Sequence, residues 1–143
     1  MAIEWDSLVV EMALLAIIIY GAVWLEVNVE KRKARKQEDA ARAQIIQFVT
    51  DDLRGKLRFI DWSIEHANYK PFFTDMWDAV LLGGKQTLLP FEVFKSLQHA
   101  YSWMKYYNNE LGQKGTSKDA IESLEEVKKS IGQSLQSLAV TKT

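Results

Sequence analysis

Residues 8–25 read LVVEMALLAIIIYGAVWL, and this stretch decides how the chain is organised. It holds eighteen residues with one charged side chain, Glu11. An α-helix from Trp5 to Trp24 rises about 28 Å, close to the thickness of the hydrocarbon core of a membrane. Trp5, Tyr20 and Trp24 stand at its ends, where aromatic rings favour the headgroup boundary. The sequence therefore predicts one N-terminal transmembrane helix.

A buried core helix and a cleavable signal peptide are the two alternatives to a membrane anchor. A core helix is disfavoured because apolar side chains cover every face of the stretch and not a single stripe. A signal peptide begins with a positively charged region. The first residues of this chain instead carry Glu4 and Asp6 and no base, so we expect an anchor.

A basic run follows the apolar stretch and consists of Lys31, Arg32, Lys33, Arg35 and Lys36. Positively charged segments stay on the cytoplasmic side of membranes. The run therefore predicts that the N-terminus lies outside and that the long C-terminal domain is cytoplasmic. The same five side chains are candidate contacts for anionic lipid headgroups, at about 1 kcal/mol for each base near the surface.

Charge is distributed unevenly along the 143 residues, although the formal net charge is only −1. Residues 1–30 hold five acids and no bases, residues 31–42 hold six bases and two acids, and residues 43–143 hold twelve of each. The distal part is neutral, which argues against nucleic acid as a partner. The chain has no cysteine, which excludes a disulfide framework and fits a reducing cytoplasm.

Helical patterns continue beyond the anchor. Residues 26–42 contain neither Gly nor Pro, so the transmembrane helix is expected to run on as a charged stalk. An amphipathic pattern then extends to about Asn68, with an apolar face formed by Ile46, Val49, Leu53, Leu57, Ile60 and Ile64. We expect Gly55, inside this pattern, to mark a close crossing of helices.

Glycine and proline divide the rest of the chain into three further helical segments. Pro71 is expected to begin a short helix, in which Phe72 and Phe73 are buried, and Gly83-Gly84 to end it. After a loop, Pro90 begins a longer helix that Gly112 closes.

The last helix is predicted to begin after Thr116 or Ser117, either of which can cap it. Its apolar stripe consists of Ile121, Leu124, Val127, Ile131, Leu135 and Leu138. Because that stripe is narrow, the helix either docks loosely on the bundle or waits for a partner.

The composite prediction is an all-α protein with one transmembrane helix, a stalk and a small bundle of three or four helices. Residues 1–30 form the anchor and residues 31–44 the basic stalk. Residues 45–111 form the bundle, and residues 112–143 form a linker and a C-terminal amphipathic helix.

The sequence offers few groups for catalysis or metal binding. Its two histidines, His66 and His99, could approach Asp61, Glu65 or Asp75 if two helices packed antiparallel. There is no Glu-x-x-His, no His-x-x-x-His and no third histidine, whereas a metal site needs three or four convergent ligands. We therefore expect no metal, no cofactor and no enzymatic activity.

Two features suggest contacts with a protein partner. Trp103, Tyr106 and Tyr107 are near neighbours on one predicted helix and cannot all point into the same core, and exposed Trp and Tyr are typical of contact surfaces. Glu11 is an acid in an apolar span, where such residues often face a partner. The alternatives stay open: Glu11 reaches the outer interface and is solvated, or the aromatic face is buried on two sides.

A resemblance to a known type of protein rests on Leu53, Leu57, Ile60, Thr74-Asp75-Met76-Trp77, Gly83, Leu89, Tyr101 and Asn108. Over about residues 8–111 the chain resembles small uncharacterised prokaryotic proteins that have a single membrane span and a cytosolic helical bundle. More remotely it is similar to accessory subunits of membrane enzyme complexes such as the archaeal ammonia monooxygenase. The resemblance implies this architecture and carries over no metal ligand.

These observations lead to two functional hypotheses. The first is a non-catalytic, membrane-anchored accessory or scaffolding subunit of a larger membrane protein complex, whose partners are other membrane protein subunits and membrane lipid. The alternative is a lone membrane-tethered sensor or regulator with a cytosolic helical domain that binds a ligand or a partner.

Overall fold

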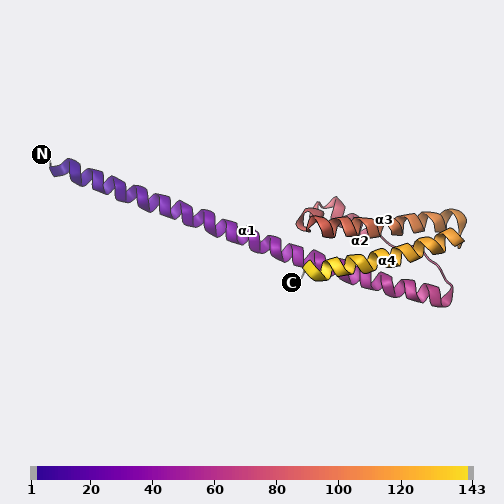
Figure 1. Cartoon of the computed structure of the whole chain (residues 1–143). Helices are drawn as coiled ribbons and strands as arrows, with labels where there is room; N and C mark the ends of the chain where they lie inside the picture. Colours follow the sequence, from indigo (N-terminus) through magenta and orange to yellow (C-terminus); the bar gives the residue numbers. More distant parts are fainter. Residues whose placement is uncertain (1–2, 142–143) are drawn as a thin grey trace. The chain divides into compact units, whose positions relative to one another are not determined.

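The computed structural model describes residues 3–141, with side chains from Asp6 onward, and all its regular elements are helices (Figure 1). They are α1 (Ile3–His66), α2 (Asp75–Leu82), the 3₁₀ helix η1 (Lys85–Leu88), α3 (Phe91–Lys114) and α4 (Lys118–Thr141). The predicted all-α class, with one long apolar N-terminal helix followed by a small bundle, is confirmed. The chain divides into two compact units, residues 1–40 and residues 41–143.

The first unit is the N-terminal part of α1. Within residues 6–141, α1 is the one helix long and apolar enough to cross a membrane, and no residue of its apolar window is buried. Side chains such as Ile17, Ile19 and Leu25 are exposed. This part of the chain is therefore a candidate membrane span; the predicted position of the Trp5 side chain lies outside the described residues.

The stalk and the amphipathic pattern that follows it belong to the same helix, because α1 continues without interruption to His66. Val49, Leu53 and Ile60 are fully buried, as predicted. The prediction for Ile64 was wrong, since that side chain is 43% exposed and Ser63 points inward instead.

α1 ends in a Schellman motif at Ala67, whose φ of 50° places it in the left-handed region. The Ala67 amide donates to the Ile64 carbonyl at 3.4 Å, and the Asn68 amide donates to the Ser63 carbonyl at 3.1 Å. These bonds satisfy two of the last four carbonyls of α1, and the chain turns away from the helix at this point.

α2 begins at Asp75 and not at the predicted Pro71. Hydrogen bonds between the side chain of Asn108 on α3 and the backbone of Phe72 explain this later start. The Phe72 amide donates to Asn108 Oδ1 at 2.7 Å, and Asn108 Nδ2 donates to the Phe72 carbonyl at 2.8 Å. The Phe72 carbonyl, which in a helix beginning at Pro71 would accept a hydrogen bond from an amide of the next turn, is thus taken by a side chain. Phe73, predicted to be buried, is 79% exposed.

Glycine fixes two of the remaining turns. Gly84, with φ 68°, follows α2 and precedes η1, where the sequence predicted a loop. α3 passes through Gly112 and ends at Gly115 instead, because Gly115 has φ 66° and ψ −153°, a backbone region that is essentially restricted to glycine.

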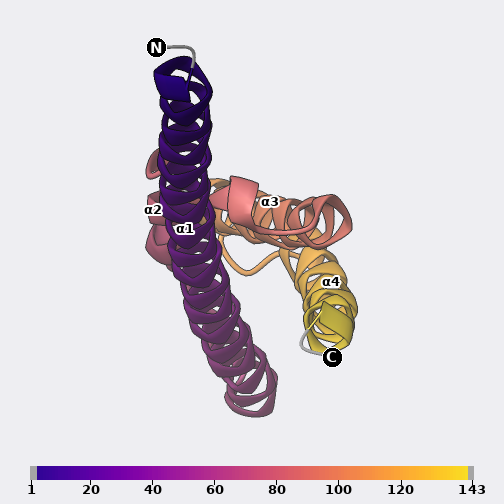
Figure 2. The ribbon, with the colours of Figure 1, turned by 90° about the vertical axis from the view of Figure 1, so that its left-hand side faces the viewer.

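α4 docks on the bundle and lies beside α3 along its length (Figures 1 and 2). Its first turn is capped by Ser117, whose Oγ accepts a hydrogen bond from the Ala120 amide at 3.2 Å. Ser134 Oγ donates to the Ser96 carbonyl of α3 at 3.1 Å. The sequence left two arrangements open for this helix, and the structure shows it packed on its own bundle.

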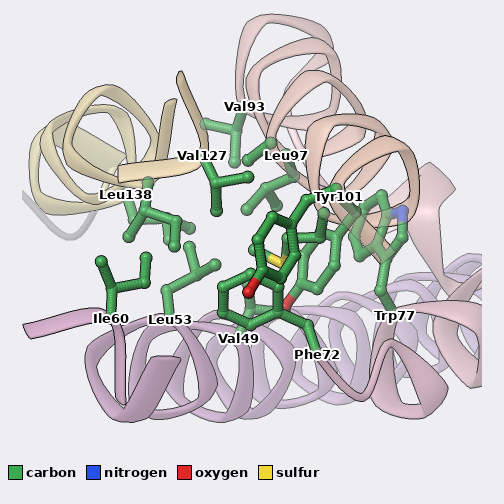
Figure 3. Close-up of a cluster of buried hydrophobic side chains, with 14 of the residues drawn as sticks. Val49, Leu53, Ile60, Phe72, Trp77, Val93, Leu97, Tyr101, Val127 and Leu138 are labelled. Carbon is green, nitrogen blue, oxygen red and sulfur yellow. The ribbon is translucent and has the colours of Figure 1, made fainter. Parts of the chain in front are cut away.

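The core of the second unit lies where α1, α3 and α4 converge (Figure 3). Trp77 of α2 completes it by stacking on Tyr101 of α3, with ring centroids 5.2 Å apart and planes 5° from parallel. Phe72 lies beside Tyr107, with centroids 5.2 Å apart. The residues labelled in Figure 3 are Val49, Leu53, Ile60, Phe72, Trp77, Val93, Leu97, Tyr101, Val127 and Leu138.

Candidate functional site

Tyr107, one of the three aromatic residues predicted to contact a partner, belongs to the core. It is 1% exposed, and its hydroxyl donates to the Lys70 carbonyl at 3.4 Å. Burial raises the pKa of Tyr107 to about 12. Its assignment to a contact surface was wrong, because a partner could reach this side chain only by opening the bundle.

Trp103 and Tyr106 remain at the surface of α3. Their rings meet edge to face with centroids 5.5 Å apart, and Tyr106 is 49% exposed. Trp103 Nε1 donates to Nε2 of His99 at 3.2 Å, which fixes the indole ring against the helix. The three neighbouring aromatic residues therefore divide between core and surface, as helical geometry requires.

A groove of about 440 Å³ lies between these two rings and the first turns of α4. Its lining comprises Trp103, Tyr106, Asp119, Glu122, Ser123, Glu125 and Glu126. Lys114 and Lys118 lie 3.4 Å and 3.9 Å from the carboxylates of Asp119 and Glu122. Because the acids come from a different helix, the spacing within α3 could not reveal that they surround the aromatic pair.

The groove combines negative charge with aromatic surface. Lys114 lies between Glu110 and Asp119, and its hydrogen bonds to these two carboxylates raise its pKa. A cation over the face of Trp or Tyr gains further attraction from the ring quadrupole. The groove therefore suits lysine or arginine side chains presented by another molecule.

The two histidines considered as metal ligands make other contacts. His66 Nδ1 lies 2.9 Å from the Trp62 carbonyl on α1, and His99 accepts the bond from Trp103. Among residues 6–141, no three His, Asp or Glu side chains converge on a point where a metal ion could bind.

Asp78 has a structural role within the bundle. It accepts hydrogen bonds from Lys105 Nζ at 2.8 Å and from Thr74 Oγ1 at 3.0 Å. The Lys105 hydrogen bond, with help from Thr74, lowers the pKa of Asp78 from its ordinary value.

Glu11 and the basic run lie on α1, where all of their side chains are exposed. Exposure leaves these side chains accessible, but it does not identify what they bind. The partner contact of Glu11 and the lipid contacts of Lys31, Arg32, Lys33, Arg35 and Lys36 therefore stay predictions.

A second concave site, which the sequence did not reveal, lies between α1 and the segment that follows it. This cleft of about 530 Å³ is lined by Asp51, Asp52, Gly55, Lys56, Phe59, Lys70, Pro71, Phe72 and Phe73. A Cβ atom placed on Gly55 would meet nothing within 4 Å. The expectation of a close helix crossing at Gly55 was wrong for the described chain, since the glycine faces open space.

A polar network borders the cleft. Asp52 accepts hydrogen bonds from the Tyr101 hydroxyl at 2.5 Å and from Lys56 Nζ at 2.6 Å. Burial, and then the bond to Asp52, raise the pKa of Tyr101 well above its ordinary range. The network joins α1 to α3 and gives that wall of the cleft a fixed shape.

Comparison of the chain with protein-family models, with curated proteins and with solved structures yields no match. The likeness to small single-pass membrane proteins therefore stays a prediction from sequence. Function must be argued from the two concave sites and the apolar part of α1.

Proposed function

We propose that this protein is a non-catalytic accessory or scaffolding subunit of a larger membrane protein complex. In this proposal α1 anchors it with the N-terminus outside, and the bundle lies in the cytoplasm, where it binds another subunit. The observation that carries the proposal is the pair of the partly buried Trp103 and the half-exposed Tyr106 beside four carboxylates.

The composition of the groove supports a docking role. A few residues usually supply most of the binding energy of an interface, and Trp and Tyr are enriched among them. Trp103 is held by His99 and by Tyr106, so little side-chain freedom is lost when a partner covers it. The surrounding carboxylates select a partner that presents basic side chains.

The test follows the full chain in its native membrane. Membranes are solubilised in a mild detergent, and native gel electrophoresis with mass spectrometry of the band identifies the proteins that migrate with the chain. We expect a large complex of fixed stoichiometry, from which the double variant Trp103→Ala, Tyr106→Ala is lost.

The matched control is Phe91→Ala, because Phe91 is, like Tyr106, an exposed aromatic residue of α3, with 70% exposure, but does not line the groove. The control should remain in the complex, and circular dichroism should show that all variants keep their helices. If the double variant stays in the complex while folded, the groove is not the docking surface.

The cleft at Gly55 favours the second candidate function, a membrane-tethered sensor that binds a ligand in its bundle. Ligand sites are typically concave and apolar with a few polar groups, and this cleft has that composition. If the wild-type chain migrates alone or as a small homo-oligomer, the accessory-subunit proposal fails and the sensor takes its place.

A further inference from the structure

We propose that the cleft at Gly55 binds an acyl-chain amphiphile with an anionic headgroup, such as a long-chain carboxylate. The site is separate from the acidic groove between α3 and α4, and the inference does not depend on the docking role of that groove. It would give the bundle a lipid-derived ligand, whatever other subunits it contacts.

Aromatic side chains form the apolar part of the cleft. Phe59 of α1 and Phe72 of the following segment meet edge to face, with centroids 5.6 Å apart. Phe73 is 79% exposed at the margin, and such an exposed ring gains free energy when an apolar ligand covers it.

Gly55 creates the space between these walls. In a helix interior, glycine is less favourable than alanine. At this position it leaves open volume where any larger side chain would project into the cleft. The resulting volume of about 530 Å³ lies within the range of small-molecule sites.

The lining of the cleft holds two carboxylates, Asp51 and Asp52, and two lysines, Lys56 and Lys70. Asp52 is neutralised by Lys56 at 2.6 Å. Asp51 is held by the Gln47 amide, whose Nε2 lies 3.1 Å and 3.0 Å from its two oxygens. Lys70 is a cation of the lining that makes no ion pair among the described residues. An anionic headgroup would find its counter-ion in Lys70.

The experiment uses the full chain in nanodiscs and a palmitate that carries a photoreactive diazirine on its acyl chain. After illumination, mass spectrometry of peptides locates the cross-links. We expect them on residues 51–59 and 70–73, and we expect Gly55→Leu to reduce them at least tenfold by filling the cleft.

Gly112→Leu is the matched control, because Gly112 is also a helical glycine whose added Cβ meets nothing within 4 Å. It should leave the cross-links in the cleft unchanged. Circular dichroism checks that both variants fold. If the cleft is disrupted by Gly55→Leu through misfolding, Gly55→Ala, which adds a single methyl group, should still fold and retain most of the cross-linking.

The headgroup is tested with Lys70→Ala. This variant should weaken labelling by the carboxylate about fivefold and leave labelling by the corresponding photoreactive alcohol unchanged. A phospholipid with the same diazirine chain distinguishes the source of the ligand: labelling of the cleft by this probe indicates a membrane lipid, and labelling by palmitate alone indicates a free fatty acid.

Three results would overturn the proposal. Cross-links confined to residues 8–25 would show only partition into the bilayer around the anchor. Equal labelling in Gly55→Leu and Gly112→Leu would show that the cleft is not the site. If no acyl probe labels the cleft, yet Gly55→Leu releases a protein subunit from the native complex, the occupant is a side chain of that subunit.

Discussion

Tyr101 shows how a single residue connects the elements of the bundle. Its ring stacks on Trp77, its hydroxyl donates to Asp52 of α1, and the side chain is 1% exposed. A buried hydroxyl must be hydrogen-bonded to avoid a desolvation cost of about 1–3 kcal/mol. Asp52 meets that requirement, and Lys56 balances the charge of Asp52. Tyr101 therefore joins α1, α2 and α3 by packing and by a polar contact at once.

The ionisation of Tyr101 and Tyr107 makes the bundle sensitive to alkaline pH. The pKa of each is raised in the folded state, for Tyr107 to about 12. The folded protein thus holds these protons more tightly than the unfolded chain, whose tyrosines ionise near pH 10. The raised pKa values therefore contribute to the free energy of unfolding. This contribution is fully present below about pH 10 and falls as pH rises, by up to about 1.4 kcal/mol per pH unit for each tyrosine.

We therefore expect the free energy of unfolding to decrease between about pH 10 and pH 12. Denaturant unfolding, followed by circular dichroism at several pH values, measures it. Tyr101→Phe and Tyr107→Phe should each flatten the decrease, because phenylalanine has no proton to lose. Tyr106→Phe, on the half-exposed side chain, is the control. Identical pH profiles for the wild type and the two core variants would contradict this linkage.

At the scale of the element, α3 ends at the glycine whose backbone leaves the helical conformation, and not at the first glycine along the sequence. Gly112 lies inside the helix and Gly115 ends it with φ 66° and ψ −153°. Alanine at position 112 suits a helix interior better than glycine, by up to about 1 kcal/mol. Alanine at position 115 would be forced into an unfavourable backbone region, at a cost of about 1–3 kcal/mol.

The two substitutions should therefore change stability in opposite directions. We expect Gly112→Ala to raise the free energy of unfolding by about 0.5–1 kcal/mol and Gly115→Ala to lower it by about 1–3 kcal/mol. Denaturant unfolding of the two variants side by side measures the difference. A loss of stability in Gly112→Ala would show that Gly112, as the sequence suggested, marks the end of the helix.

The elements were predictable where local chemistry decides them. The apolar spacing identified the inward face of α1 up to Ile60, and Ser117 caps α4 as expected. The start of α2 was not predictable, because it depends on the side chain of Asn108, thirty-six residues away from Phe72. Periodicity describes one helix at a time, whereas this helix end is set by a contact between distant segments.

The candidate sites were predictable only in part, for the same reason. Helical spacing showed that Trp103, Tyr106 and Tyr107 must diverge, but it could not tell which of them faces the core. The acids beside Trp103 come from α4, and the cleft combines part of α1 with residues 70–73. A glycine inside a helical pattern, such as Gly55, is visible in the sequence. Its open surroundings depend on where the neighbouring elements lie.

At the scale of the whole molecule, the two units bury their apolar surface differently. Residues 41–143 have a core of their own, to which α1, α2, α3 and α4 all contribute. The apolar residues of the first unit, such as Leu14 and Ile18, are exposed in the isolated chain. Because such a large apolar surface is unfavourable in water, the first unit requires lipid or protein around it.

The proposed orientation of this candidate membrane helix can be tested cleanly because the chain has no cysteine. Ser7→Cys places one thiol just before the candidate span in the sequence, and Ser102→Cys places one on α3 of the bundle, at positions whose side chains are exposed. If the basic run holds the C-terminal part inside, a membrane-impermeant maleimide should label position 7 in intact cells.

Position 102 should be labelled only after the membrane is permeabilised. The reverse pattern would place the bundle and its acidic groove outside the cell and would contradict the cytoplasmic docking role. Labelling of both positions in intact cells, with the chain released by a salt wash, would show that α1 does not cross the membrane at all.

Reversal of the basic run, by exchanging Lys31, Arg32 and Lys33 for glutamate, should increase the inverted fraction if these charges set the orientation.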